Sequence, residues 1–120
     1  GELFDKITIL EIKKTKIKDK DKVSNVEKEL LTLNKTLEEH GLNKVNEELK
    51  SLVQILTNIN LDLWEIEDGK REFEKKGEFG DDFISLARAV YKKNDIRAKT
   101  KLKINELLGS NIKEVKSYKN

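Results

Sequence analysis

The feature of this sequence that most constrains its fold is a long apolar stripe between Leu42 and Lys76. Apolar residues recur there at alternating steps of three and four, the spacing that places side chains on one side of an α-helix. They are Leu42, Val45, Leu49, Leu52, Leu56, Ile59, Leu63, Ile66 and Phe73, with Lys70 interrupting the series. At 1.5 Å per residue this helix would be roughly 50 Å long, against the ~35 Å diameter of a compact protein of this size. The other segments therefore pack along this rod or extend it towards a partner.

Composition favours a single all-α domain. Of the 120 residues, 36% are hydrophobic and 40% are charged, a balance that suits amphipathic helices, and no Pro interrupts them. Cys is absent and His40 is the only histidine, which excludes disulfides, thiolate metal sites and histidine-rich metal centres within one chain. We expect no cofactor and no metal. No apolar run approaches the ~20 residues that span a bilayer, so we expect a cytoplasmic protein without a membrane span.

The periodicity predicts four helices, and small or polar residues mark their ends. The predicted helices cover residues 2–17, 22–40, 42–76 and 82–108. Suitable N-caps are Asp19 or Asp21 for the second helix and Asp81 or Asp82 for the fourth, and Gly41, Gly77 and Gly109 follow predicted helix ends. We expect residues 1–109 to form one helical domain and residues 110–120 to form a C-terminal tail. Because the chain has no Met, we do not expect Gly1 to be the native first residue.

Apolar residues are mirrored about Gly41, which predicts an antiparallel helical hairpin. The mirrored pairs are Leu37 with Val45, Leu33 with Leu49, Leu30 with Leu52, Val26 with Leu56, and Val23 with Ile59. The fourth helix would then fold back on the third, placing Arg88 beside Asp68. The predicted architecture is an elongated antiparallel bundle of about four helices around this coiled-coil hairpin. The overlong rod and the thin core also predict a homodimer.

Two groups of polar residues are candidates for chemistry. The first is acidic: Glu65, Glu67 and Asp68 lie beside Trp64, with Glu2 and Asp5 at the amino end. Carboxylates on one helical face would hold Mg²⁺, as in all-helical nucleotide pyrophosphatases, although the upstream Glu-x-x-Glu of those enzymes is missing. The alternative is a solvated acidic face with one ion pair to the next helix.

The second group is cationic and amide-bearing. It comprises Arg88, Asn94, Asp95, Arg97, Lys101 and Asn105. Guanidinium groups bind carboxylates or phosphates through two hydrogen bonds, as a metal-free site of the chorismate-mutase type would require. The alternative is structural: Arg88 pairs with Asp68, while Asn94 and Arg97 fix the helix register.

Several sequence blocks resemble a family of small uncharacterised bacterial proteins, a domain of unknown function. These blocks are Gly1–Lys6, Ile9–Lys13, Leu63–Asp68, Leu86–Tyr91, Asn94–Ala98, Lys101, Ile104–Asn105 and Lys116–Tyr118. The resemblance implies no activity, but its blocks gather at the end of the molecule remote from Gly41. We therefore expect one polar pocket there, with ligand-binding residues Asp5, Lys6, Trp64, Glu65, Asp68, Arg88, Tyr91, Asp95 and Arg97.

Two classes of function follow from these observations. The leading hypothesis is a non-enzymatic interaction or scaffold protein that forms a homodimer and has an unidentified protein partner. The competing hypothesis is a small-ligand enzyme or binding protein that uses a polar pocket near Arg88 and Asp68. No nucleophile–base pair or phosphate loop is present, so we predict no catalytic residue. The basic residues Lys92, Lys99 and Lys103 have no aromatic residues interleaved, so we do not expect nucleic-acid binding.

Overall fold

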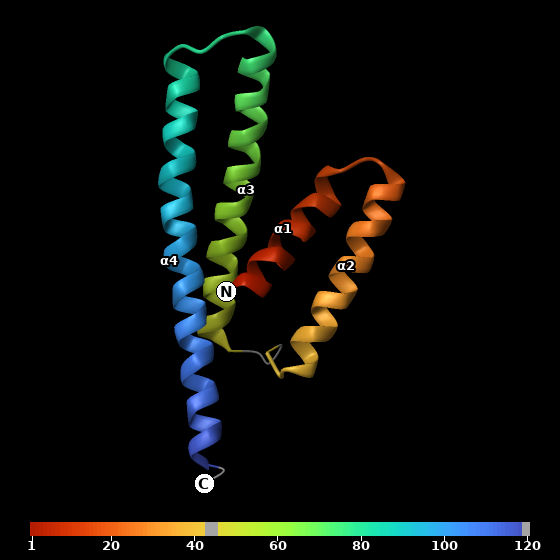
Figure 1. Ribbon diagram of the computed structural model, residues 1–120, viewed down its shortest axis with the longest axis vertical. Helices are drawn as coiled ribbons and strands as arrows, with labels where there is room; N and C mark the ends of the chain where they lie inside the picture. Colours follow the sequence, from red (N-terminus) through yellow and green to blue (C-terminus); the bar gives the residue numbers. More distant parts are fainter. Residues whose placement is uncertain (43–45, 119–120) are drawn as a thin grey trace.

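The described part of the chain folds into four helices, as the periodicity predicts. The computed structural model describes the backbone of residues 1–42 and 46–118 and the side chains of residues 1–42 and 46–109. The helices are α1 (Glu2–Lys16), α2 (Lys20–Glu39), α3 (Glu47–Lys76) and α4 (Asp81–Tyr118) (Figure 1). Within the described residues there is no strand, so the all-α prediction is confirmed. No helix in this part of the chain is long and apolar enough to cross a membrane.

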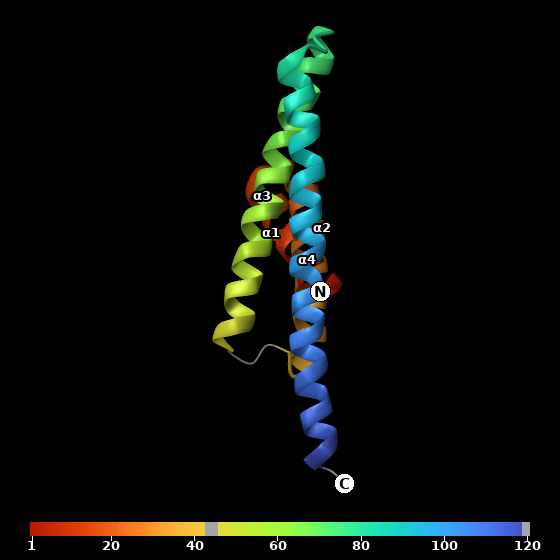
Figure 2. The same ribbon diagram turned by 90° about the vertical axis from the view of Figure 1, so that its left-hand side faces the viewer.

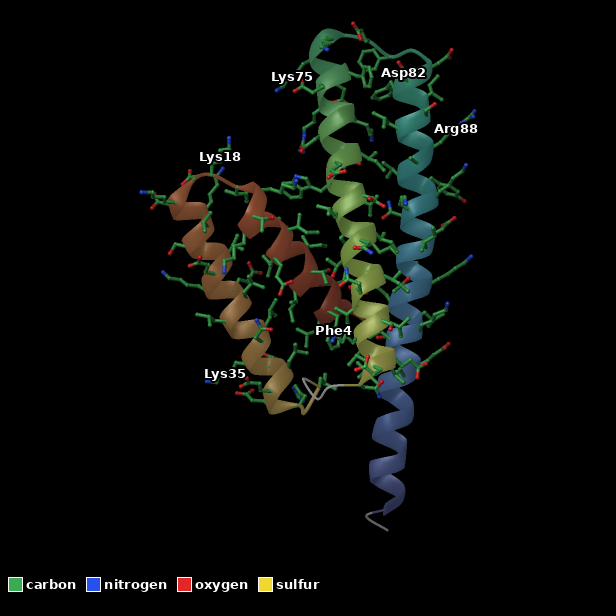
Figure 3. The ribbon with its side chains drawn as sticks, turned by 180° about the vertical axis from the view of Figure 1, so that it is seen from behind. Phe4, Lys18, Lys35, Lys75, Asp82 and Arg88 are labelled. Atoms are coloured by element: carbon green, nitrogen blue, oxygen red, sulfur yellow. The ribbon has the colours of Figure 1, made fainter. Side chains whose placement is uncertain are left out.

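The helices lie side by side in a flat, elongated array of 63 × 33 × 18 Å. Figure 1 shows them in the order α4, α3, α1, α2 across the molecule, and α3 and α4 run antiparallel. The packed pairs are α3 with α4, α1 with α2, and α1 with α3. One end of the α3–α4 hairpin, which includes Lys75, Asp82 and Arg88, projects beyond α1 and α2, and we call this end the projecting half (Figures 1, 2 and 3).

The predicted hairpin between the second and third helices is wrong, because α1 lies between α2 and α3. Gly41 does end α2 in the left-handed conformation, with a φ of 66°, as predicted. However, α3 begins only at Glu47, where the Asn46 side chain accepts hydrogen bonds from the N–H groups of Glu48 and Leu49. The connection is therefore several residues long and leaves room for a third helix. Val45, a member of one mirrored pair, lies outside the described residues.

The apolar stripes of α2 and α3 nevertheless point into one core. The buried members of this core are Phe4, Ile7 and Leu10 of α1, Val26, Leu30 and Leu37 of α2, Leu49 and Leu56 of α3, and Ile104 of α4. Thus α1 supplies the apolar surface that the prediction had assigned to direct contact between α2 and α3.

The longest helix is α4, with 38 residues, and not the helix predicted from Leu42 to Lys76, of which α3 forms 30 residues. The predicted helix end at Gly109 is also wrong, since α4 continues to Tyr118. A glycine inside a helix costs only about 1 kcal/mol relative to alanine, and no proline follows to stop the helix. The division into a domain and a tail at this position stays a prediction.

The predicted fold of the fourth helix back onto the third is confirmed, but its predicted ion pair is wrong. Gly77 ends α3 with a φ of 68°, and Lys93 of α4 lies 2.9 Å from the carboxylate of Asp62 of α3. Asp68 pairs instead with Arg71, one turn along its own helix, at 2.5 Å. Arg88 is exposed because it lies on the side of α4 opposite to the half-buried Leu86, which faces α3.

Candidate functional site

The main polar centre of the molecule lies where α1, α3 and α4 meet. Asp5 of α1 is only 3% exposed there. The Arg97 side chain of α4 binds its carboxylate through two groups: Nε donates to Oδ1 at 3.0 Å, and Nη2 pairs with Oδ2. From α3, Asn60 Nδ2 donates to Asp5 Oδ1 at 3.0 Å and to Thr8 Oγ1 at 2.9 Å. We call Asp5, Thr8, Asn60 and Arg97 the Asp5 cluster.

Local sequence explains why these groups share one buried site. Asp5 and Thr8 are one turn apart on α1, and the Thr8 hydroxyl donates to the Asp5 carbonyl at 2.8 Å. Asn60 is buried one turn after Leu56 on α3. In the described part of the chain, no buried side-chain nitrogen or oxygen lacks a hydrogen-bond partner. A buried charge is tolerated when it is paired and hydrogen-bonded in this way.

The surroundings of Asp5 favour its charged form. Burial by itself raises the pKa of Asp5, but the hydrogen bonds from Arg97 and Asn60 and the charges of Arg97 and Lys101 outweigh it. The pKa of Asp5 is therefore lowered from its ordinary value. The same hydrogen bond to Asp5 raises the pKa of Arg97. The pair is thus an ionised carboxylate–guanidinium pair that joins two helices.

Further polar contacts extend the cluster along α4. The ammonium of Lys101 lies 2.5 Å from the Glu2 carboxylate and 3.8 Å from that of Asp5. Its hydrogen bond lowers the pKa of Glu2. Asn94 Oδ1 accepts from Arg97 Nη1 at 3.4 Å. The pairs of Arg97 with Asp5 and of Lys101 with Glu2 support the structural alternative stated for Arg97, because they join α4 to α1. The Asn94 bond lies within α4.

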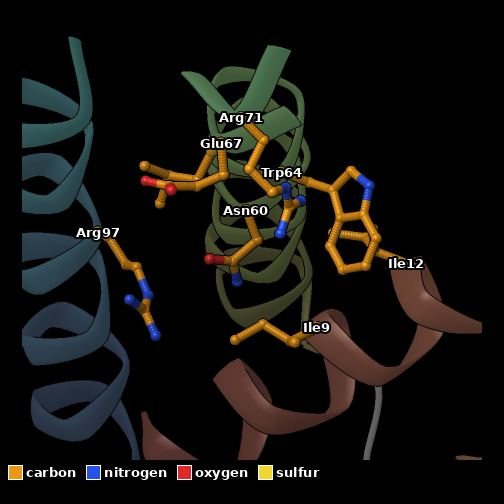
Figure 4. A pocket seen from close by; sticks show the side chains of 8 residues that line it. Ile9, Ile12, Asn60, Trp64, Glu67, Arg71 and Arg97 are labelled. Carbon is orange, nitrogen blue, oxygen red and sulfur yellow. The ribbon is translucent and has the colours of Figure 1, made fainter. Parts of the chain in front are cut away.

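An open pocket of about 300 Å³ adjoins the Asp5 cluster. It is lined by Ile9 and Ile12 of α1, by Asn60, Leu63, Trp64, Glu67 and Arg71 of α3, and by Arg97 of α4 (Figure 4). Figure 4 shows the Trp64 ring leaning towards Ile12, while Arg71 points down the same side of α3. The pocket thus combines an aromatic and aliphatic wall with two guanidinium groups, both of which already have carboxylate partners.

The structure does not bring the nine predicted ligand-binding residues around one pocket. Asp5, Trp64 and Arg97 lie in or beside it. The other six are exposed at separate positions: Lys6, Glu65, Asp68, Arg88, Tyr91 and Asp95. Figure 3 shows Arg88 extending away from the molecule, on the side of α4 turned away from α3. Their convergence is therefore wrong, because Arg88, Tyr91 and Asp95 share the side of α4 that faces away from α3, whereas Arg97 lies on the opposite side.

Two residues of the Asp5 cluster were absent from the predicted site. Asn60 interrupts the apolar sequence around Ile59 and Leu61, and Thr8 stands between Ile7 and Ile9. A polar residue inside an apolar helical stretch is the signal that identifies such positions. Among the described residues, no group of three or more His, Cys, Asp or Glu side chains is placed to hold a metal ion.

The fold and the Asp5 cluster together define a class: an all-α protein whose first helix is fixed to a long hairpin by a buried carboxylate–guanidinium pair. The chain belongs to the family of unknown function DUF6165, whose family model matches residues 1–120. This confirms the resemblance to a domain of unknown function. Comparisons with curated proteins and with solved structures gave no match.

Proposed function

We propose that this protein is a non-enzymatic helical scaffold that works as a homodimer. The observation that carries the proposal is the large apolar side chains that α4 and the hairpin tip expose to solvent. They are Phe79, Ile84, Tyr91, Ile96 and Leu102. Four of these five side chains lie on α4, and exposed apolar residues gathered on one helix are typical of a protein–protein interface.

The hydrogen bonds that Asp5 already accepts within the protein support a structural role for the Asp5 cluster. Its carboxylate already accepts hydrogen bonds from Arg97 and Asn60, and it is buried. An acid or base in catalysis needs a proton to exchange with a substrate within hydrogen-bond reach. In the proposed scaffold, Asp5 and Arg97 instead hold α1 at a defined place on the α3–α4 hairpin.

Light scattering tests the homodimer. At high micromolar concentration we expect twice the 13.9 kDa mass of one chain. Leu102→Glu should shift the mass towards that of the monomer, because it places a charge in the proposed interface. Leu31→Glu is the matched control, since Leu31 is an exposed leucine on α2, and it should leave the dimer intact. A 13.9 kDa species at high micromolar concentration contradicts the proposal.

A second candidate function is the binding of a small anionic ligand in the pocket beside Trp64. Its support is the pocket itself, at the lower end of the ~300–1,000 Å³ range of ligand sites, with Arg71 and Arg97 in its wall. This candidate replaces the predicted site near Arg88 and Asp68, because Arg88 is exposed on the side of α4 turned away from α3 and neither residue lines the pocket.

Tryptophan fluorescence tests this candidate directly, since Trp64 is the only tryptophan of the chain. Nucleotides with Mg²⁺ and small dicarboxylates should change its emission and raise the melting temperature if they bind the native state. Arg71→Gln should abolish both effects. Lys92→Gln is the control, because Lys92 is exposed on α4 outside the pocket. A silent screen leaves the scaffold as the supported function.

The cytoplasmic location and the lack of nucleic-acid binding belong to the same proposal. Lys92, Lys99 and Lys103 are exposed on α4 and have no accompanying aromatic residues at their spacing. Cell fractionation tests the location. Salt-dependent binding of DNA or RNA to the purified chain would contradict the second point.

A further inference from the structure

The side of α4 that faces away from α3 carries a regular row of exposed residues. From Ile84 to Leu102 they recur at alternating steps of four and three. The row consists of Ile84, Arg88, Tyr91, Asp95, Ala98 and Leu102. We call these six residues the outer α4 row. Their spacing is the heptad spacing through which two helices pack in a coiled coil.

Nothing in the described chain covers this row. Figure 2 shows α4 in front of the other helices along the hairpin, with no helix crossing it. Tyr91 is 71% exposed, Leu102 is 57% exposed and Ile84 is 44% exposed. Residues that face the core, such as Arg97 and Ile104, lie on the opposite side of α4. The row is therefore an unpartnered helix face about 27 Å long, at 1.5 Å per residue over its eighteen steps.

The charges of the row indicate which partner it fits. Arg88 and Asp95 are one heptad apart, with Tyr91 between them. The row thus carries one cation and one anion, and its ends, Ile84 and Leu102, are both apolar. When two copies of the row run antiparallel, the apolar ends of one copy face the apolar ends of the other, and each arginine lies near the aspartate of the other copy. Two parallel copies in register would instead place Arg88 opposite Arg88 and Asp95 opposite Asp95, which like-charge repulsion disfavours.

We propose that two copies of this chain pack antiparallel along the outer α4 row, about a twofold axis level with Lys93. In this register Ile84 lies opposite the partner's Leu102, and Tyr91 lies opposite the partner's Asp95. Arg88 lies opposite the partner's Ala98, whose small side chain leaves space for the guanidinium. The guanidinium reaches the partner's Asp95, which is about 4.5 Å further along the axis. Each contact occurs twice, so the assembly closes as a dimer.

This geometry rests on the homodimer proposed above and adds the surface, orientation and register of its interface. Other antiparallel registers are poorer matches. A shift by one heptad in one direction places Ile84 opposite the partner's Asp95. A shift in the other direction moves Arg88 and the partner's Asp95 apart by about another 10 Å. Lys92 and Lys99 flank the row, where their exposed ammonium groups remain in solvent.

Cysteine crosslinking tests the register, because the native chain contains no Cys. The double variant Ile84→Cys/Leu102→Cys should form a disulfide-linked dimer under mild oxidation, detected on a non-reducing gel. Neither single variant should crosslink with itself, because equal positions in the two copies are about 27 Å apart, and disulfides need Cα atoms within ~7 Å. A mixture of the two single variants should crosslink as a heterodimer.

Charge exchange provides a second test that leaves the fold intact, because both residues are exposed. Arg88→Asp alone should weaken dimerisation by about tenfold in Kd, and adding Asp95→Arg should restore it. Crosslinking by a single variant alone indicates a parallel dimer and overturns the proposed geometry. A dimer by light scattering without any crosslink also overturns the geometry but leaves the scaffold proposal standing. A monomer by light scattering overturns both.

Discussion

The junction of α1, α3 and α4 and the projecting half of the α3–α4 hairpin differ in how their shared helices are held. At the junction, Leu56 and Ile104 have no exposed surface, and the Asp5 cluster supplies hydrogen bonds between three helices. In the projecting half only two helices meet, and their facing residues, such as Leu86 and Val90, are only partly buried. The hairpin therefore has a fully buried core only where α1 packs against it as a third helix.

The two regions differ in how strongly an ion pair can stabilise the packing of the helices. A carboxylate shielded from water by a third helix interacts strongly with its partners, whereas an exposed ion pair is screened by solvent. Asp5 with Arg97 is the first kind of pair, and Lys93 with Asp62, just beyond the junction, is closer to the second kind. The outer α4 row runs from the projecting half to the level of the junction, so it leaves a free face beside both regions.

Removing the buried carboxylate should have the largest effect. We expect Asp5→Ala to lower the free energy of unfolding by about 3 kcal/mol, because Arg97 and Asn60 lose their shared partner inside the protein. Urea unfolding followed by circular dichroism measures this. Asp68→Ala removes an exposed carboxylate paired with Arg71 and should cost about 0.5 kcal/mol. Equal losses in the free energy of unfolding of the two variants would show that the buried carboxylate contributes no more to stability than the exposed one.

Low pH should lower the stability of the fold, because it protonates Asp5 at the junction. Its pKa is lower in the folded chain than the ordinary value of 3.8, so the charged form stabilises the fold. This stabilisation is fully present above the ordinary pKa and is lost as pH falls through the lowered pKa of the folded state. Urea unfolding between about pH 7 and about pH 2.5 should therefore show a flatter acid limb in Asp5→Asn than in the native chain. Parallel pH profiles would contradict this role.

An effect as small as that of Asp68→Ala is expected at the Lys93–Asp62 pair, which is more exposed than the pair of Asp5 with Arg97. Lys93→Ala should lower the free energy of unfolding by about 0.5 kcal/mol, since both Lys93 and Asp62 are partly exposed. The loss should shrink further at high salt, which screens the pair. Lys92→Ala, at the exposed neighbouring position, is the control and should be neutral. A loss as large as that of Asp5→Ala would contradict the expected difference between the buried and the more exposed ion pair.

Local features of the chain could be predicted well from its sequence. Asp19 caps α2 by accepting hydrogen bonds from the N–H groups of Asp21 and Lys22, as the sequence indicated. Gly41 and Gly77 end their helices with positive φ. Each of these features depends on residues within one helical turn, which is why local pattern was sufficient.

The Asp5 cluster could be predicted only in part. Asp5 and Arg97 were both candidates, but the expected partner of the acidic face on α3 was Arg88. Arg97 follows Arg88 by nine residues, or two and a half helical turns, so the two arginines lie on opposite sides of α4. The choice between them depends on which side of α4 faces the other helices, and periodicity on α4 left that open because Leu and Ile occur on both sides.

The pattern of residues along the chain is enough to predict an all-helical protein, the ends of most helices, and the apolar faces of α1, α2 and α3. The position of α1 between α2 and α3 follows from how the helices pack. So do the contacts of Asp5 with Asn60 and Arg97, which are 55 and 92 residues away along the chain. The physical reason is that a helix depends on its neighbours in sequence, whereas any apolar stripe can cover any other. The choice among stripes depends on connection length and on the pairing of buried polar groups, which arise only when distant segments meet.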